Sequence, residues 1–267
     1  MTDADKVFRD ISAIRAKNPV ILSITNYVVT NTTANALLAI GASPIMSHAV
    51  EEMAEIVAIS GAVVINLGTV APEYLAAMDP AWAAADEHGT PVVLDPVGAG
   101  ASMLRTVTPL ALLDSHRAFI VRGNASEIMT LAGSSGSEAK GVDSIAASDD
   151  AASAAQNLSA RYDCAVAVSG EADVVVEGAA RARVLGGSAL MPRVTGLGCT
   201  ATAICAAFAA VNRNPFEAAL NACVTMKVAG ELAAEKSRGP GTLQLHFYDA
   251  LYNLTEQDLI DHTKVVR

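Results

Sequence analysis

Short runs of β-branched and other apolar residues alternate along the chain with longer alanine-rich stretches. The runs have the length of buried strands, and the stretches have the length of helices. Continuous apolar strands separated by helices are typical of a mostly parallel sheet that helices cover on both faces. The sequence therefore predicts an α/β fold with strands at 20–24, 62–66, 91–95, 118–121 and 164–169.

Helix candidates lie between these strands, and each is entered or left through Asp, Asn, Ser, Pro or Gly. They cover residues 32–39, 50–60, 72–87, 104–114, 126–132 and 149–161. From residue 200 onward the pattern is helical, over 200–212, 215–236 and a last helix after 239–241. Two β-rich runs, 173–177 and 181–185, are expected to form a hairpin at the sheet edge.

The composition suits one large core, because 52% of the 267 residues are hydrophobic and only 17% are charged. No linker rich in Gly, Ser or Pro divides the chain, so we expect a single domain over residues 1–267. The segment 133–137 is expected to be a flexible surface loop.

The net charge of −10 argues against a nucleic-acid-binding protein, because such proteins neutralise phosphates with clustered Lys and Arg. No apolar stretch reaches the roughly 18 residues of a membrane span. Residues 1–10 are charged where a signal peptide would be apolar, so we expect a cytosolic protein without a membrane partner. The four cysteines have no CxxC spacing, which favours reduced thiols over disulfides or a zinc site.

A glycine-rich segment, TGLGCT at 195–200, stands directly before an alanine-rich helix candidate. Gly196 and Gly198 would let the backbone turn and approach a ligand closely. The first N–H groups of the helix and its dipole favour an anion, so the segment is suited to hold a phosphate. A close contact between helix and sheet is the alternative explanation of the same glycines.

Polar residues follow several predicted strands, at the end where open α/β sheets bind ligands. Asn26 and Asp95 each stand at such an end, and Arg122 and Glu127 flank another. Asp95 and Glu127 offer hard oxygen ligands to Mg²⁺, which takes only one or two carboxylates besides waters and phosphates. Arg122 could clamp a phosphate. The alternative for both acids is a position at a helix cap or in its first turn.

These motifs resemble the hydroxyethylthiazole kinase family of the ribokinase-like superfamily, and the resemblance runs essentially from end to end. Its most specific pieces are NTTAN at 31–35, GASPIM at 41–46, LDPVGA at 94–99, RGNASEI at 122–128 and TGLGCT at 195–200. The resemblance implies a ribokinase-like fold and ATP-dependent phosphorylation of the primary alcohol of 4-methyl-5-(2-hydroxyethyl)thiazole in thiamine salvage. It also implies a homotrimer with sites near the subunit interfaces.

By position, Met46 looks like a thiazole contact and Gly196 like a residue beside the substrate hydroxyl. A methionine suits a small aromatic heterocycle through its polarisable sulfur, although core packing explains it equally well. Asn26 is a further candidate for substrate binding because it ends a strand.

Arg122 and Ser169 resemble the nucleotide-contacting positions of the family, and Thr195 is grouped with them. Asn124 and Glu127 match the Asn-x-x-Glu pattern of the superfamily, which organises Mg²⁺ and its waters around the phosphates.

Cys199 stands where most ribokinase-like small-molecule kinases carry an aspartate that accepts the substrate's hydroxyl proton. A helix N-terminus should favour a thiolate, which could accept that proton. Phosphoryl transfer has a loose transition state in most analyses, so positioning and charge neutralisation outweigh base strength. We therefore expect Cys199 to assist modestly, and backbone N–H groups from Gly196 through Gly198 to Thr200 to hold the moving phosphoryl group together with Mg²⁺.

Other functions remain open at this point. A related kinase of another small alcohol, such as hydroxymethylpyrimidine, would keep the Mg²⁺ and glycine elements but change the pocket around Asn26 and Met46. A nucleotide-dependent lyase and a catalytically silent nucleotide sensor are further options on the same scaffold. A cysteine-nucleophile transferase is disfavoured because no histidine stands near Cys199 in sequence. Lys227 and Lys236 lie on a helix candidate, where a solvated face is the default expectation, although one of them could approach the nucleotide phosphates.

Overall fold

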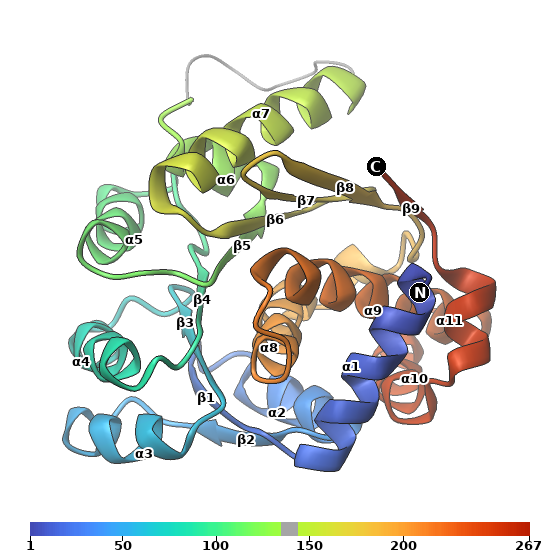
Figure 1. Cartoon of the computed structure of the whole chain (residues 1–267), viewed down its shortest axis with the longest axis horizontal. Helices are drawn as coiled ribbons and strands as arrows, with labels where there is room; N and C mark the ends of the chain where they lie inside the picture. Colours follow the sequence, from blue (N-terminus) through green and yellow to red (C-terminus); the bar gives the residue numbers. More distant parts are fainter. Residues whose placement is uncertain (135–143) are drawn as a thin grey trace.

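A computed structural model describes residues 1–134 and 144–267. The described chain forms one nine-stranded sheet in the order β2-β1-β3-β4-β5-β6-β7-β8-β9, flanked by helices (Figure 1). The strands are β1 (Val20–Ile24), β2 (Ser43–Met46), β3 (Ala62–Asn66), β4 (Val92–Asp95), β5 (Ile120–Asn124), β6 (Ala165–Ser169), β7 (Asp173–Glu177), β8 (Ala180–Val184) and β9 (Val265–Val266).

The α-helices are α1 (Asp3–Lys17), α2 (Thr30–Ile40), α3 (Met53–Ile59), α4 (Pro72–His88), α5 (Met103–Ser115), α6 (Ala125–Leu131), α7 (Ser144–Tyr162), α8 (Leu197–Ala209), α9 (Pro215–Glu235), α10 (Pro240–Asn253) and α11 (Glu256–His262). Two short 3-10 helices, η1 (Val50–Glu52) and η2 (Met191–Arg193), complete the described elements. The alternation of strands and helices confirms the predicted α/β class.

The sheet is parallel from β2 through β6 and antiparallel from β6 to β9. Parallel strands need crossover connections, and helices supply them here. Because the parallel strands share one direction, their carboxyl ends meet at one edge, which we call the rim. The rim is the place where ligands bind in folds of this type.

Alternate residues of each strand point to opposite faces of the sheet, and each face has its own core. On β3, Val64 packs with the inner helices α1, α2, α8, α9 and α10, while Val63 and Ile65 pack with the outer helices α3 to α7. Figure 1 shows the sheet curling around α8 and α9. Burial on both faces explains why the strands read as continuous apolar runs.

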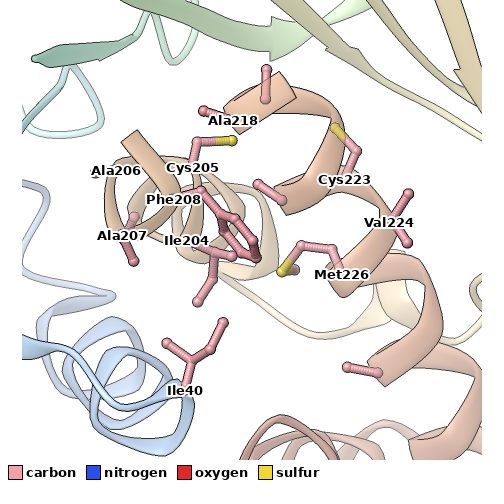
Figure 2. Close-up of a cluster of buried hydrophobic side chains, with 14 of the residues drawn as sticks. Ile40, Ile204, Cys205, Ala206, Ala207, Phe208, Ala218, Cys223, Val224 and Met226 are labelled. Carbon is pink, nitrogen blue, oxygen red and sulfur yellow. The ribbon is translucent and has the colours of Figure 1, made fainter. Parts of the chain in front are cut away.

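The inner core is built around α8 and α9 (Figure 2). Phe208 and Ile204 of α8 lie beside Met226 of α9, and all three are buried. Small residues such as Ala207 of α8 and Ala218 of α9 occupy the remaining core positions and allow close helix packing. This packing fixes α8 against β3 and β4, so the N-terminus of α8 is held at the rim.

Several elements differ from the predictions. The helix expected at 50–60 is divided into η1 and α3. Strand β2 was not predicted because it contains Pro44, which an edge strand tolerates. The β7–β8 hairpin is confirmed, but its placement at the sheet edge is wrong, because β9 pairs with β8 and takes the edge.

The terminal helices were also missed. Helix α1 begins with a capping box between Thr2 and Asp5, and α11 begins with one between Thr255 and Asp258. The surface loop predicted at 133–137 lies for the most part outside the described residues. No helix of the described chain is long and apolar enough to cross a membrane.

Candidate active site

The rim gathers the polar residues that end the parallel strands. Asn66 of β3 pairs in register with Asp95 of β4, and Asn124 of β5 pairs with Ser169 of β6. Asn26 lies two residues after the end of β1 and is buried. The sheet register therefore brings these strand ends to the same rim, as their parallel direction predicts.

The glycine-rich segment forms the N-terminus of α8, as predicted. Gly196 is the N-cap with a φ of 84°, a left-handed conformation that favours glycine. The Thr200 N–H donates to the Gly196 carbonyl at 2.8 Å, so the N–H groups of the preceding turn have no intrahelical acceptor. A side chain at Gly196 would also lie 2.4 Å from Cγ1 of Val29. The turn therefore offers donors to an anion, and it is packed too tightly for any other residue.

Arg122 of β5 lies directly against this turn. A Cβ built on Gly198 would stand 3.1 Å from Nη1 of Arg122. Burial opposes the charge of the guanidinium, but nearby Asp95 holds the pKa of Arg122 above its usual value. The permanent positive charge and the N-terminus of α8 therefore converge on the same point.

A cavity of about 950 Å³ opens beside Arg122 and Gly198. Ser169 lines it at the end of β6, and its hydroxyl donates weakly to the Gly123 carbonyl at 3.4 Å. Residues 186–189, 191–194 and Met226 form further walls. The cavity is large enough for a nucleotide, and its end at Arg122 is the place suited to phosphates.

Asp95 is fully buried behind this point, and its two carboxylate oxygens differ. Its Oδ2 accepts from Thr202 Oγ1 at 2.6 Å and from Asn66 Nδ2 at 2.8 Å. Its Oδ1 has no hydrogen-bond partner. Burial raises the pKa of Asp95 to about 6, against the attraction of Arg122 and the bond from Thr202. One oxygen is thus held in place while the other is available to a ligand.

Glu127 is engaged with the backbone through both carboxylate oxygens. Its Oε2 accepts from the Asn124 N–H at 2.8 Å and its Oε1 from the Gly98 N–H at 2.9 Å. The Asn124 side chain accepts in return from the Glu127 N–H, which completes a capping box on α6. Glu127 is therefore an acid in the first turn of α6, which was the alternative interpretation of this residue. Asn124 is the N-cap and is exposed.

Cys199 is half-buried in the first turn of α8, and its sulfur accepts from Asn26 Nδ2 at 3.3 Å. Burial raises the pKa of the Cys199 thiol, and the nearby Asp95 raises it further. The expectation that the helix N-terminus makes Cys199 a ready thiolate is therefore wrong in this environment. The other three cysteines are buried free thiols, as predicted.

Met46 and Thr195 are the remaining predicted site residues. Met46 is half-buried on β2, where it pairs in register with Ser23, three residues before Asn26. Thr195 is exposed immediately before the Gly196 cap.

Lys227 was expected on a solvated face, and the structure places it in the cavity wall instead. Its ammonium donates to the carbonyls of Gly170 (2.8 Å) and Glu171 (3.0 Å) and pairs with Asp173 at 3.1 Å. The local sequence does not indicate that Lys227 is buried, because its burial depends on how the β6–β7 turn lies over α9.

Asn66, Thr202 and Arg105 are further site residues without an assigned role in the sequence. Arg105 of α5 donates to the carbonyls of Leu67 (2.5 Å) and Val97 (2.9 Å), which joins two rim loops. Asn66 could have been identified from its position at the end of a predicted strand, whereas nothing in the local sequence marks Thr202 or Arg105 as site residues.

Comparison with known proteins settles the family. Residues 11–257 match the model of the hydroxyethylthiazole kinase family. The chain belongs to this family. A relative named hydroxyethylthiazole kinase, from Nitratidesulfovibrio vulgaris (strain Miyazaki F), is 51% identical over 267 residues and covers 100% of both chains.

Solved structures agree with this assignment. A hydroxyethylthiazole kinase protein from Pyrococcus horikoshii OT3 is 38% identical, with a TM-score of 0.91 and 98% of each chain covered. A ribokinase-like superfamily protein from Enterococcus faecalis V583 is 12% identical, with a TM-score of 0.64 over 90% of this chain and 87% of that one. The second likeness supports the ribokinase-like fold alone.

Proposed function

We propose that the protein transfers the γ-phosphoryl group of ATP to the primary hydroxyl of 4-methyl-5-(2-hydroxyethyl)thiazole, in thiamine salvage. Family membership supports the substrate, and the meeting of Arg122, Asp95 and the N-terminus of α8 supports phosphoryl transfer. The convergence of a helix N-terminus and a buried arginine on the end of a nucleotide-sized cavity is the observation that carries the proposal.

The nucleotide occupies the cavity beside Ser169, with its phosphates toward Arg122 and Thr195 near the phosphate end. The substrate lies on the other side of the α8 N-terminus, toward Asn26 and Met46. In the transfer, the bond from the γ-phosphorus to the bridging oxygen of ATP breaks and ADP leaves, while a bond from the phosphorus to the alcohol oxygen forms and the alcohol proton passes to water. The N–H groups from Gly196 to Thr200 and the Arg122 charge stabilise the transferring group.

Magnesium fits the carboxylates present. Asp95 has one oxygen without a partner, which is the arrangement a single-carboxylate Mg²⁺ site requires. Among the described residues, no group of three or more His, Cys, Asp and Glu could hold a metal, so a zinc-type cage is not built there. We propose Asp95 as the direct ligand, with Glu127 and Asn124 acting through waters. When bound, Mg²⁺ neutralises charge on the phosphate oxygens.

Cys199 contributes as a neighbour of the hydroxyl and does not become covalently modified. Its raised thiol pKa makes it a poor proton acceptor at neutral pH, and the loose transition state makes little demand on a base. Its sulfur and Asn26 help to place the alcohol. Charge neutralisation by Arg122, and by the Mg²⁺ that Asp95 would hold, contributes more to the rate.

We propose further that residues 1–267 act as one kinase domain, that the protein is a homotrimer and that its sites lie near subunit interfaces. Family resemblance supports the trimer, and sedimentation velocity or light scattering at micromolar concentration tests it. A cytosolic location remains a prediction from the sequence.

Coupled ADP release with Mg-ATP tests the substrate, using hydroxyethylthiazole, hydroxymethylpyrimidine and no acceptor as parallel conditions. We expect release that depends on the thiazole, with the phosphate ester identified by mass. Release with the pyrimidine alone would assign a related kinase, and nucleotide binding without any turnover would assign a sensor.

A further inference from the structure

Four side chains form a continuous hydrogen-bonded chain beneath the rim, from Asp95 through Asn66 and Asn26 to Cys199. Asn66 Nδ2 donates to Asp95 Oδ2 at 2.8 Å, and Asn66 Oδ1 accepts from Asn26 Nδ2 at 3.1 Å. The same Asn26 nitrogen lies 3.3 Å from the sulfur of Cys199. Asn66 is 0% exposed and Asn26 is 6% exposed, so water does not compete for these bonds.

Two neighbours fix the orientation of the Asn66 amide, because one can only donate a hydrogen bond and the other can only accept one. The Gly68 N–H is a backbone donor, and it lies 2.8 Å from Asn66 Oδ1. The carboxylate of Asp95 is an acceptor, so the nitrogen of Asn66 must face it. Both neighbours therefore demand the same orientation of this amide.

The orientation of the Asn66 amide also determines that of the Asn26 amide. Because Asn66 presents an oxygen, Asn26 must present its nitrogen, and the two hydrogens of that nitrogen serve Asn66 and Cys199. Gly68 closes over the same amide, since a Cβ at Gly68 would stand 2.4 Å from Asn26 Nδ2. The sulfur of Cys199 is thereby held as an acceptor.

We propose that Asn66 is a positioning residue, which fixes the amide of Asn26 so that its nitrogen holds the sulfur of Cys199 beside the anion-binding turn. Asn66 does not line the nucleotide cavity, and it acts on the Cys199 thiol both directly, through its own side chain, and through Asn26. The inference deepens the proposed function and rests on it only for its kinetic consequence. The hydrogen-bond chain can be tested in the protein without any substrate.

The test follows alkylation of Cys199 by iodoacetamide as a function of pH, with the modified residue identified by mass spectrometry. A donor to the sulfur favours the thiolate, so its loss moves the inflection of the rate curve to higher pH. Asp95 and Arg122 are the charged groups that act on this thiol, and both are kept in every variant. Changes in access alter the height of the curve and leave the inflection in place.

Asn66→Ala removes the chain, and we expect the inflection to move to higher pH. Thr202→Val is the matched control, because it removes the other donor to Asp95 Oδ2, together with a weak bond to the Gly198 carbonyl at 3.4 Å, and keeps the side chains of Asn66, Asn26 and Cys199. Its inflection should match that of the unmodified sequence. Gly68→Ala pushes the Asn26 amide away without removing Asn66 and should act like Asn66→Ala, which keeps the test available if Asn66→Ala does not fold.

An unmoved inflection in both Asn66→Ala and Gly68→Ala would overturn the proposal, and so would an equal movement in Thr202→Val. In the kinase assay we expect Asn66→Ala to lower kcat by less than about tenfold, as Cys199→Ala does, with an unchanged KM for ATP. A chain without thiazole kinase activity would contradict the proposed function, while the alkylation result would still decide the role of Asn66.

Discussion

Replacing Gly196 with alanine perturbs the anion-binding turn at its most constrained point. Gly196 has a φ of 84°, where an alanine costs roughly 1–2 kcal/mol. The new Cβ would also stand 2.4 Å from Val29 Cγ1, whereas ordinary contacts lie at 3.4–4 Å. The backbone of the turn must therefore retreat by about 1 Å, a displacement that can cost about 100-fold in rate.

Gly89→Ala provides the matched control. Gly89 caps α4 with a φ of 63°, and no atom lies within 4 Å of a Cβ built there. Both variants carry the strain of a left-handed alanine, so both should lose roughly 2–8 °C in Tm. Only Gly196→Ala moves the N–H groups that hold the phosphoryl group.

Thermal unfolding and steady-state kinetics with saturating Mg-ATP and thiazole measure the two effects separately. We expect kcat of Gly196→Ala to fall by about 100-fold while Gly89→Ala keeps its activity. The reasoning is refuted if the two variants lose similar stability and Gly196→Ala keeps kcat within about threefold of Gly89→Ala.

Four further variants test the thiol and the charged residues of the site. Cys199→Ala should lose less than about tenfold in kcat while Asp95→Ala loses about 1000-fold, and equal losses in steady-state assays would contradict the minor role of the thiol. The pKa of Asp95 rises from 3.8 to about 6 in the fold, so the unfolded carboxyl ionises first and stability falls as pH rises between those values. Asp95→Asn should therefore raise the free energy of unfolding at pH 7.5 by at most about 3 kcal/mol, with no gain at pH 4, and a variant destabilised equally at both pH values would refute this. Arg122→Met should raise KM for ATP by about 10- to 100-fold, and an unchanged KM would remove Arg122 from the phosphate site.

The rim could be predicted from sequence because it follows from strand direction. Once β3 and β4 are parallel neighbours, Asn66 and Asp95 must meet at their carboxyl ends. The turn at Gly196 could also be predicted, because glycines before an alanine-rich run indicate a turn that leads into a helix. Such features depend on short segments and on one general rule of α/β sheets.

Other features depend on contacts between distant segments, which no local pattern records. The bond from Asn26 to Cys199 joins residues far apart in sequence, and burial there reverses the expected effect of the helix N-terminus on the thiol. Lys227 has the sequence context of a solvated helix face, and only the turn laid over α9 buries it. Strand β2 was not predicted because it contains Pro44. A proline is tolerated in an edge strand, but the sequence does not show which strand lies at the edge of the sheet.

The most direct test of the central claim is the transfer of label from γ-³²P-ATP to an acceptor in a single turnover. Hydroxyethylthiazole and hydroxymethylpyrimidine are compared at equal concentration, with Arg122→Met as the site control. We expect label in the thiazole phosphate ester, much less in the pyrimidine, and a strongly reduced yield in the variant. Label that reaches only water or the pyrimidine, or a yield that Arg122→Met leaves unchanged, would contradict the account.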